Sequence, residues 1–380
     1  MELGVLARIP PVLGHPCRVL EELISPPRRL YVRVNTARIS VDKYIALTGS
    51  LGVELWRDEE VPCAVWAPVE GPFEPRRYRG RVVADKRASE SVLMGSDLYA
   101  PGVIMAGGFE RGDKVSIYSP NGIHVGSGVA VMGPEEMVRS RRGLAVRVDE
   151  PVYRSVRVHD LPGHGEGLIY GQSVTSMYVG LLVEPRTGDI IVDLNAAPGG
   201  KVSHIAQRAM EGGEKPRIIA VDRRSKELLL RANLERLGLD SIVEVRSGDS
   251  RRITRWMPGL AGKASVVLVD PPCSNLGVRP KVYEEKRAKD IANYVMYQRG
   301  FLREAARLLR PGGLLIYSTC TLTASENQGN RAWAIEELGL EPADPSMPLE
   351  RPVRAGRGEL LFSPLQGTPG FYIALLRRPG

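Results

Sequence analysis

One stretch decides the fold of this 380-residue chain: Asp189-Ile190-Ile191-Val192-Asp193-Leu194-Asn195-Ala196-Ala197-Pro198-Gly199-Gly200-Lys201. Its first half is almost continuously apolar, as in a strand buried on both faces, and its second half is a turn of small residues that opens a helix. The same alternation continues through the C-terminal half, with strands at 217–222, 242–246, 265–270 and 314–318 and helices at 201–210, 225–237 and 290–309. This pattern predicts an α/β fold with a doubly wound parallel sheet.

The ends of the chain follow other patterns. Two strands, 359–362 and 371–376, are joined by a turn rich in Pro and Gly, so we expect a terminal hairpin that makes one edge strand antiparallel. Near the N-terminus, short periodic segments predict a small α+β unit, and β-branched runs split by Gly and Pro between 81 and 152 predict a β-rich module. The elements expected around this module are a strand at 30–36, a helix at 41–51, a strand-like segment at 53–65 and a helix at 172–183.

The composition excludes several classes of protein. Hydrophobic residues make up 43% of the chain and charged residues 25%, which is typical of globular domains, and the length accommodates two or three of about 150 residues. No apolar run approaches the roughly 18 residues of a membrane span, and residues 1–8 lack the pattern of a signal peptide. We therefore expect a cytoplasmic protein without membrane contact. The scattered cysteines and histidines argue against a disulfide framework and against a metal site.

The charge distribution favours a polyanionic partner. The formal net charge is +8 and the pI is near 9.3. Between Arg76 and Arg157 there are 14 Lys or Arg and nine Asp or Glu, with arginines concentrated at 76–81 and 139–142. A solvated surface without a partner would have a similar composition, so this inference depends on the motifs.

Acidic residues follow the second and third strands of the predicted sheet, where doubly wound folds bind ligands. The loop after the first strand is not a P-loop, because Asn195 replaces its first Gly and Val202 its Mg-binding hydroxyl residue. Asp222 is placed to bind ribose hydroxyls and Asp249 the amino group of an adenine. These acids, without a phosphate-binding motif, predict a nucleoside ligand such as S-adenosylmethionine. For either Asp alone, a helix N-cap is the alternative.

The next two strands end in Asp270-Pro271-Pro272-Cys273 and Ser318-Thr319-Cys320-Thr321. If these strands are neighbours, about 4.8 Å apart, both thiols face one cleft beside the methyl donor. Two thiols suit methylation of carbon 5 of a pyrimidine, because a thiolate added at carbon 6 makes carbon 5 nucleophilic. One cysteine then starts the reaction, a second group assists its completion, and Asp270 holds the edge of the base. The spacing alone does not say which cysteine attacks.

These residues resemble the Nop/Sun family of RNA cytosine-5 methyltransferases, through the motifs Ala-Ala-Pro-Gly-Gly-Lys (196–201), Asp-Pro-Pro-Cys (270–273) and Thr-Cys (319–320) in order. The resemblance covers nearly the whole chain and implies a Rossmann-like methyltransferase sheet. It also implies that Cys320 is the nucleophile, that Cys273 assists product release, and that Asp270 and Lys201 belong to the catalytic set. The implied contacts of S-adenosylmethionine are Ala197, Gly199, Gly200, Lys201, Asp222, Asp249 and Asp270. The chain departs from the family pattern at Asn195, Val202 and Pro369.

The β-rich module resembles a PUA domain, an RNA-binding β-barrel, through Met94-Gly95-Ser96-Asp97-Leu98-Tyr99-Ala100-Pro101-Gly102-Val103 and Arg111-Gly112-Asp113-Lys114-Val115. An inserted PUA domain is similar to one branch of the family, whose members methylate a cytidine near the end of the tRNA acceptor stem. The resemblance implies tRNA as the partner, bound through its acceptor stem and CCA end, with the two arginine clusters on phosphates. The expected domains are an RRM-like α+β domain at 1–78 and, with a linker, 152–185, the PUA domain at 79–151, and the methyltransferase domain at 186–380.

Two alternatives remain at this point. The first is the same reaction on ribosomal RNA, which the PUA insertion disfavours. The second is an RNA-binding protein that keeps the fold without catalysis, and the presence of Lys201, Asp270, Cys273 and Cys320 argues against it.

Overall fold

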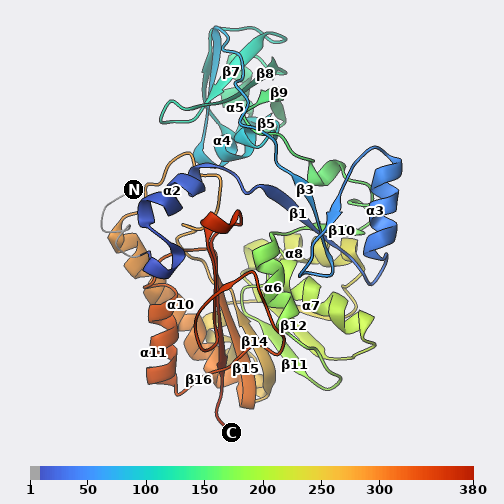
Figure 1. Cartoon of the computed structure of the whole chain (residues 1–380), viewed down its shortest axis with the longest axis vertical. Coiled ribbons are helices and arrows are strands. Elements are labelled where there is room, and N and C mark those ends of the chain that lie inside the picture. The colour runs from blue at the N-terminus through green and yellow to red at the C-terminus, as the bar shows by residue number, and fades with distance from the viewer. Residues whose placement is uncertain (1–8) are drawn as a thin grey trace.

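The computed structural model describes residues 9–380 and contains three sheets (Figure 1). Residues 1–8, where the sequence indicates no signal peptide, lie outside the described residues. The largest sheet is central, a four-stranded sheet lies beside it, and a six-stranded sheet forms a module at one end of the molecule, at the top of Figure 1. Nowhere in 9–380 is a helix both long and apolar enough to cross a membrane.

The central sheet has the strand order β13-β12-β11-β14-β15-β19-β18-β17. Its first five strands are parallel: β11 (Ile190–Asp193), β12 (Arg217–Asp222), β13 (Val243–Ser247), β14 (Ala264–Val269) and β15 (Leu309–Thr319). The chain progresses from β11 to β13 in one direction and then returns to place β14 on the other side of β11. This reversal is a topological switch point, the position where such sheets bind ligands. The predicted doubly wound fold is confirmed.

The antiparallel part of this sheet is larger than expected. β18 (Glu359–Phe362) and β19 (Phe371–Arg377) form the predicted hairpin, and β19 pairs antiparallel with β15. However, the hairpin does not supply the edge strand, because β17 (Val353–Gly356) pairs with β18, and β16 (Glu341–Pro342) pairs with the end of β19. Both additional strands are short and mostly exposed, so they lack the apolar alternation that identifies a strand in a sequence.

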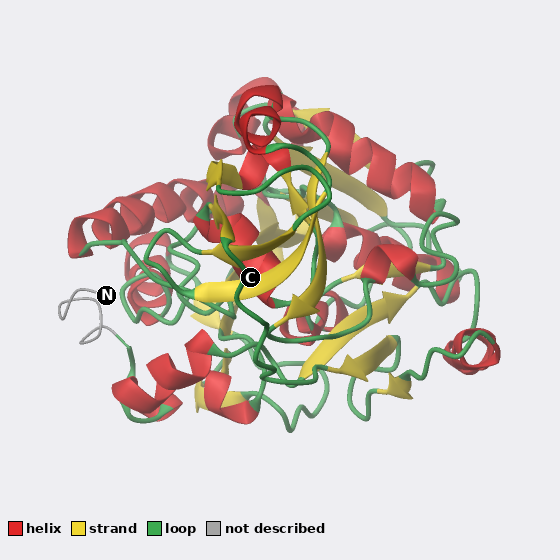
Figure 2. Cartoon of the chain, turned by 90° about the horizontal axis from the view of Figure 1, so that it is seen from above, coloured by secondary structure: helices red, strands yellow, loops and turns green. Residues whose placement is uncertain are grey.

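Helices cover both faces of the central sheet, and Figure 2 shows them on either side of its strands. Successive residues of a strand point to opposite faces, so Ile191 packs in one hydrophobic cluster and Val192 in the other. One layer consists of α6 (Val174–Leu181), α7 (Gly200–Glu211) and α8 (Arg224–Leu237). The other consists of α2 (Pro16–Ile24), α9 (Ile253–Trp256), α10 (Ala288–Leu308) and α11 (Gln328–Leu338). The 3-10 helices are η1 (Pro11–Leu13), η2 (Ala100–Gly102), η3 (Val158–Asp160), η4 (Ser250–Arg252), η5 (Pro258–Leu260) and η6 (Pro364–Gln366).

The N-terminal α+β unit is confirmed as a four-stranded antiparallel sheet of order β10-β1-β3-β2 with one helix. Its elements are β1 (Arg29–Val34), α3 (Val41–Ser50), β2 (Trp56–Arg57), β3 (Ala64–Pro68) and β10 (Ile169–Gly171). The segment 53–65, expected as one strand-like stretch, is divided by a turn in which the Asp58 carboxylate accepts hydrogen bonds from the backbone of Glu60 and Val61. β10 was not predicted; it precedes α6, which begins after its N-cap Ser173.

The six-stranded sheet has the order β5-β9-β8-β7-β4-β6 and is inserted between β3 and β10 of the α+β unit. Its strands are β4 (Gly80–Ala84), β5 (Leu98–Tyr99), β6 (Val103–Gly107), β7 (Lys114–Tyr118), β8 (His124–Ala130) and β9 (Leu144–Pro151). Two helices, α4 (Lys86–Leu93) and α5 (Pro134–Ser140), accompany them. The predicted β-rich module is therefore confirmed.

Candidate active site

A cavity of about 700 Å³ opens at the carboxyl ends of the parallel strands. Residues that follow five of these strands line it together, although they are far apart in the sequence: Ala197, Asp222, Asp249, Asp270, Cys273 and Cys320. The fold thus gathers the predicted acids and both late cysteines in one place, because parallel strands present their carboxyl ends at one edge of the sheet.

The remaining residues of the first loop lie next to this cavity. Gly200 and Lys201 line a second space of about 230 Å³, which shares Ala197 and Asp270 with the first. Gly199 lines neither space. Its φ of 117° is in the region that favours glycine, and it lets the chain turn from the loop into α7.

Cys273 and Cys320 form a thiol pair, with their sulfur atoms 3.3 Å apart. β14 and β15 are neighbours, as expected, and their register places Val269 opposite Tyr317, so the two following loops meet. The side-chain oxygen of Asn275 accepts hydrogen bonds from both thiols, at 3.2 Å from Cys273 and 3.0 Å from Cys320. Asn275 was not predicted as a site residue, although it lies only two positions after Cys273.

The two thiols have different environments. Cys273 is 5% exposed, whereas Cys320 is partly exposed. The hydrogen bond with Cys320 and burial raise the pKa of the Cys273 thiol well above its usual value. Cys273 therefore retains its proton, and Cys320 is the more exposed of the two sulfurs.

Asp270 is held from two sides. The Nζ atom of Lys201 lies 2.5 Å from one carboxylate oxygen, and the hydroxyl of Ser318 donates to the other at 2.7 Å. Burial alone would lower the pKa of Lys201, but Asp270 and then Asp193 more than offset this, so the pKa is raised. Asp193 is itself buried, which raises its pKa to about 7. The site thus contains a fixed ammonium–carboxylate pair beside the thiols.

Asp222 and Asp249 line the cavity at two neighbouring strand ends. The carboxylate of Asp222 accepts hydrogen bonds from the backbone of Ala197 at 2.9 Å and of Arg223 at 2.7 Å. Asp249 is the N-cap of η4, and its side chain makes two 2.9 Å hydrogen bonds with the Arg251 guanidinium. The N-cap interpretation therefore holds for Asp249, and the same carboxylate also lines the cavity.

Comparisons with known proteins identify the family. The family model "16S rRNA methyltransferase RsmB/F" matches residues 180–377, and the PUA model matches residues 80–152. The chain belongs to the RsmB/F (Nop/Sun) family of RNA methyltransferases. It is an S-adenosylmethionine-dependent RNA cytosine-5 methyltransferase with a PUA domain, which confirms the resemblance noted from its motifs.

Two curated relatives and one solved structure align with most of the chain. The tRNA (cytosine(72)-C(5))-methyltransferase of Pyrococcus horikoshii is 38% identical over 95% of this chain and 92% of its own length. Human tRNA (cytosine(72)-C(5))-methyltransferase NSUN6 is 30% identical over 87% of this chain and 77% of its own. The crystal structure of NSun6 from Pyrococcus horikoshii with SFG, an analogue of S-adenosylmethionine, has a TM-score of 0.85 at 37% identity and covers 96% of this chain and 94% of that one.

A further space of about 400 Å³ lies on the other side of Cys320 in this RsmB/F-family enzyme. It is mostly apolar; the α+β unit supplies Arg29 and Tyr31 to its wall, and β19 supplies Phe371. Cys320 therefore borders two spaces, the 700 Å³ cavity and this one beside the α+β unit. Phe371 was not predicted as a site residue, because it reads as an ordinary apolar position of a strand.

Arg33 of β1 connects the α+β unit to the start of α7. It is fully buried, and its guanidinium donates to the carbonyl of Gly200 at 2.5 Å and to the hydroxyl of Ser203 at 2.6 Å. These contacts hold the first turn of α7, which begins directly after the small-residue loop. No sequence signal pointed to this arginine, because its contacts are made 167 and 170 residues further along the chain.

Proposed function

We propose that this enzyme methylates carbon 5 of cytosine 72 in the acceptor stem of tRNA. The observation that carries the proposal is the thiol pair of Cys273 and Cys320 beside Asp270, at the edge of a cavity large enough for a nucleoside. Such a pair suits methylation at carbon 5 of a pyrimidine, because this carbon requires covalent activation. Methylation of a base amino group, the alternative reaction, requires no such activation. The position within tRNA is supported by the two relatives named for cytosine 72, which align with nearly the whole chain, including its PUA domain.

The residues around the larger cavity fit S-adenosylmethionine. Asp222 and Asp249 present carboxylates at two neighbouring strand ends, and the loop at Ala197 contains no P-loop sequence. We assign Ala197, Gly199, Gly200, Lys201, Asp222, Asp249 and Asp270 to cofactor binding. When bound, S-adenosylmethionine supplies the electrophilic methyl group.

Activation of the base is assigned to three side chains. The thiolate of Cys320 adds to carbon 6 of the cytosine, and the ring electrons move toward its nitrogen edge. Asp270 holds that edge, and Lys201, 2.5 Å from Asp270, places a positive charge and a proton where the negative charge develops. Carbon 5 then has enamine character and can accept the methyl group.

Release of the product is assigned to Cys273. Water that enters the open cavity accepts the proton from carbon 5, the electrons of that C–H bond restore the double bond between carbons 5 and 6, and the bond from carbon 6 to the Cys320 sulfur breaks, so that the sulfur leaves as a thiolate. The Cys273 thiol lies 3.3 Å from that sulfur and keeps its proton because of its environment. It can therefore donate a hydrogen bond to the leaving thiolate.

Placement of the tRNA is assigned to the inserted module. We propose that the PUA domain binds the CCA end and that the exposed arginines at 76–81 and 139–142 contact phosphates. The base must leave its helix to reach Cys320, at a cost of a few kcal/mol that phosphate contacts can offset. The same proposal includes a cytoplasmic location and a division of the chain into domains at 1–78, 79–151, 152–185 and 186–380.

The rival substrate is ribosomal RNA. The 16S rRNA family model matches only residues 180–377, whereas the alignment with the archaeal tRNA enzyme extends over 95% of the chain, which favours tRNA.

Methylation of defined transcripts tests the proposal. Purified protein is incubated with labelled S-adenosylmethionine and tRNA that carries C72, the same tRNA with U72, or ribosomal RNA fragments. We expect 5-methylcytidine at position 72 of the first RNA only. Methylation of ribosomal RNA, or of another cytosine in both tRNAs, would contradict the proposed substrate.

A further inference from the structure

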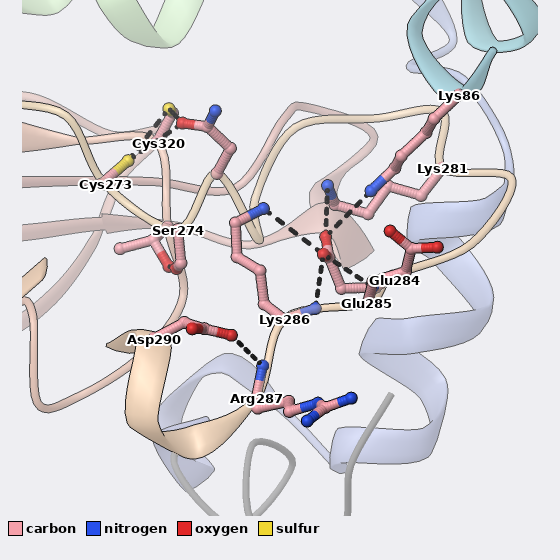
Figure 3. Close-up of polar contacts among 12 residues, drawn as sticks. Lys86, Cys273, Ser274, Lys281, Glu284, Glu285, Lys286, Arg287, Asp290 and Cys320 are labelled. Atoms are coloured by element: carbon pink, nitrogen blue, oxygen red, sulfur yellow. Dashed lines mark hydrogen bonds and ion pairs between the residues drawn. The ribbon is translucent and has the colours of Figure 1, made fainter. Parts of the chain in front are cut away.

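The loop that connects β14 to α10 joins the thiol pair to the PUA domain. It begins at Asp270 and carries Cys273 and Asn275 within its first six residues. It then leaves the methyltransferase domain and reaches α4 of the PUA domain at Glu284 (Figure 3). A segment of the active site is thus anchored at its far end in the domain assigned to RNA placement.

The apex of this loop is part of the PUA core. Val282 is 8% exposed and packs in the hydrophobic cluster of the PUA domain. Its backbone carbonyl accepts a hydrogen bond from Asn121 at 3.2 Å, and its backbone N–H donates to Glu90 of α4 at 3.4 Å. The loop therefore docks on the PUA domain through both apolar and polar contacts.

Glu284 fastens the apex by charge. Its side chain is 4% exposed and lies between three ammonium groups: Lys281 at 3.2 Å, Lys286 at 3.3 Å and Lys86 of α4 at 3.3 Å (Figure 3). Burial alone would raise the pKa of Glu284, but Lys281 and Lys286 prevail and lower it to about 2. The carboxylate is thus charged at neutral pH, and Lys86 is its partner from the PUA domain.

Two contacts hold the backbone of the first half of the loop beside the cysteines. On one side, the N–H of Gly277 donates to the carbonyl of Cys320 at 2.9 Å, and a Cβ at Gly277 would lie 2.1 Å from the Gly370 carbonyl oxygen, so only glycine fits there. On the other side, Gln298 of α10 donates to the carbonyl of Pro272 at 3.1 Å.

The middle of the loop is also held firmly. Arg279 donates to the carbonyls of Ser25 at 2.8 Å and Pro364 at 2.9 Å. The backbone of the loop is therefore held at several points between the apex and the thiol pair.

We propose that Glu284 is a positioning residue for the reaction: by fastening the loop to Lys86 of the PUA domain, it sets the position of Cys273 and Asn275 relative to Cys320. The PUA domain then completes the active site in addition to binding RNA. This inference rests on the proposed function, because it uses the role assigned to Cys273 in product release.

The test compares two isosteric variants that each remove one carboxylate charge at the boundary of the PUA domain. Glu284→Gln weakens the loop attachment. Asp97→Asn weakens the bond between Asp97 and Arg157, which joins the PUA domain to the linker at 3.0 Å without touching the loop. For Glu284→Gln we expect kcat to fall about tenfold with little change in KM for tRNA, and a covalent protein–RNA complex to accumulate on denaturing gels.

Each outcome has a defined meaning. Asp97→Asn should leave the covalent fraction at the wild-type level, and equal covalent fractions in the two variants would overturn the inference, as would an effect of Glu284→Gln on KM alone. If Glu284→Gln does not fold, Lys86→Met takes its place, because it removes the PUA partner and leaves two lysines to neutralise Glu284. Wild-type protein that forms no 5-methylcytidine would instead refute the proposed function.

Discussion

The sulfur of Cys320 lies 3.3 Å from that of Cys273, and a single amide oxygen, that of Asn275, accepts a hydrogen bond from each. The arrangement is asymmetric, because Cys273 is buried in its loop and Cys320 borders two open spaces. Cys320 is therefore the more accessible sulfur for a nucleobase, while Cys273, which also lines the larger space, remains within hydrogen-bonding distance of it. This asymmetry matches the roles assigned to an attacking and a releasing cysteine.

Substitution of each cysteine separates these roles. Cys320→Ala removes the atom that bonds to carbon 6, so we expect neither methylation nor a covalent protein–RNA complex. Cys273→Ala leaves the attack possible and impairs release, so we expect the covalent complex to accumulate after incubation with tRNA and S-adenosylmethionine. Denaturing gels with labelled tRNA measure both. The reverse pattern would exchange the two assignments.

Asn275 provides a second test of the thiol pair. Asn275→Asp keeps the shape of the side chain but places a negative charge 3.0 Å from the Cys320 sulfur, which disfavours the thiolate. We expect the rate at neutral pH to fall by about tenfold, because the added charge disfavours the nucleophilic thiolate. Asn275→Ala is the control, because it removes the acceptor without adding charge. Equal rates for Asn275→Asp and Asn275→Ala would show that charge at this position does not govern the thiol.

The parallel part of the fold was predictable because its strands carry a local signal. β11, β12 and β14 are apolar on both faces, and the turns between strands and helices contain Gly or Pro, so the series is visible in single segments. β10 was missed because its three residues are too few to show a period, and β17 because it is mostly exposed and lacks an apolar pattern. Their pairing is determined by partners elsewhere in the chain.

The site was predictable where its residues follow strands and unpredictable where tertiary contacts create it. Asp270 and Cys320 come directly after neighbouring strands, so their proximity follows from the topology of a parallel sheet. In the sequence, Arg33 is one residue of an alternating strand pattern, and Glu284 resembles an ordinary charged residue of a solvated loop. Only folding brings Arg33 to Gly200 and Glu284 to Lys86, over separations of 167 and 198 residues.

The raised pKa of Asp193 predicts that the stability of the protein depends on pH. Burial raises its pKa in the folded protein from 3.8 to about 7, so the folded state binds a proton that the unfolded state has already released between these values. The contribution of Asp193 to stability is therefore full below about pH 4 and decreases as the pH rises toward 7, by at most about 1.4 kcal/mol per pH unit. Asp193→Asn cannot titrate at this position. Urea unfolding of both proteins at several pH values should show the wild type losing stability relative to the variant as the pH rises from 4 to 7, and a constant difference would contradict the expectation.

Salt dependence tests the assignment of the arginine clusters to tRNA phosphates. Arg139 in the last turn of α5 and Arg142 shortly after this helix are exposed, and each phosphate that they neutralise would release counterions when tRNA binds. The plot of the logarithm of the tRNA-binding constant against the logarithm of salt concentration should therefore be steep for the wild type. In the double variant Arg139→Ala/Arg142→Ala, the slope should be about one unit shallower for each phosphate that is no longer neutralised. A charge-matched control is Arg217→Ala/Arg310→Ala, because these arginines are exposed near the amino ends of β12 and β15, where no ligand is expected. Identical slopes for the two double variants would show that the attraction comes from net charge and not from phosphate binding by the PUA domain.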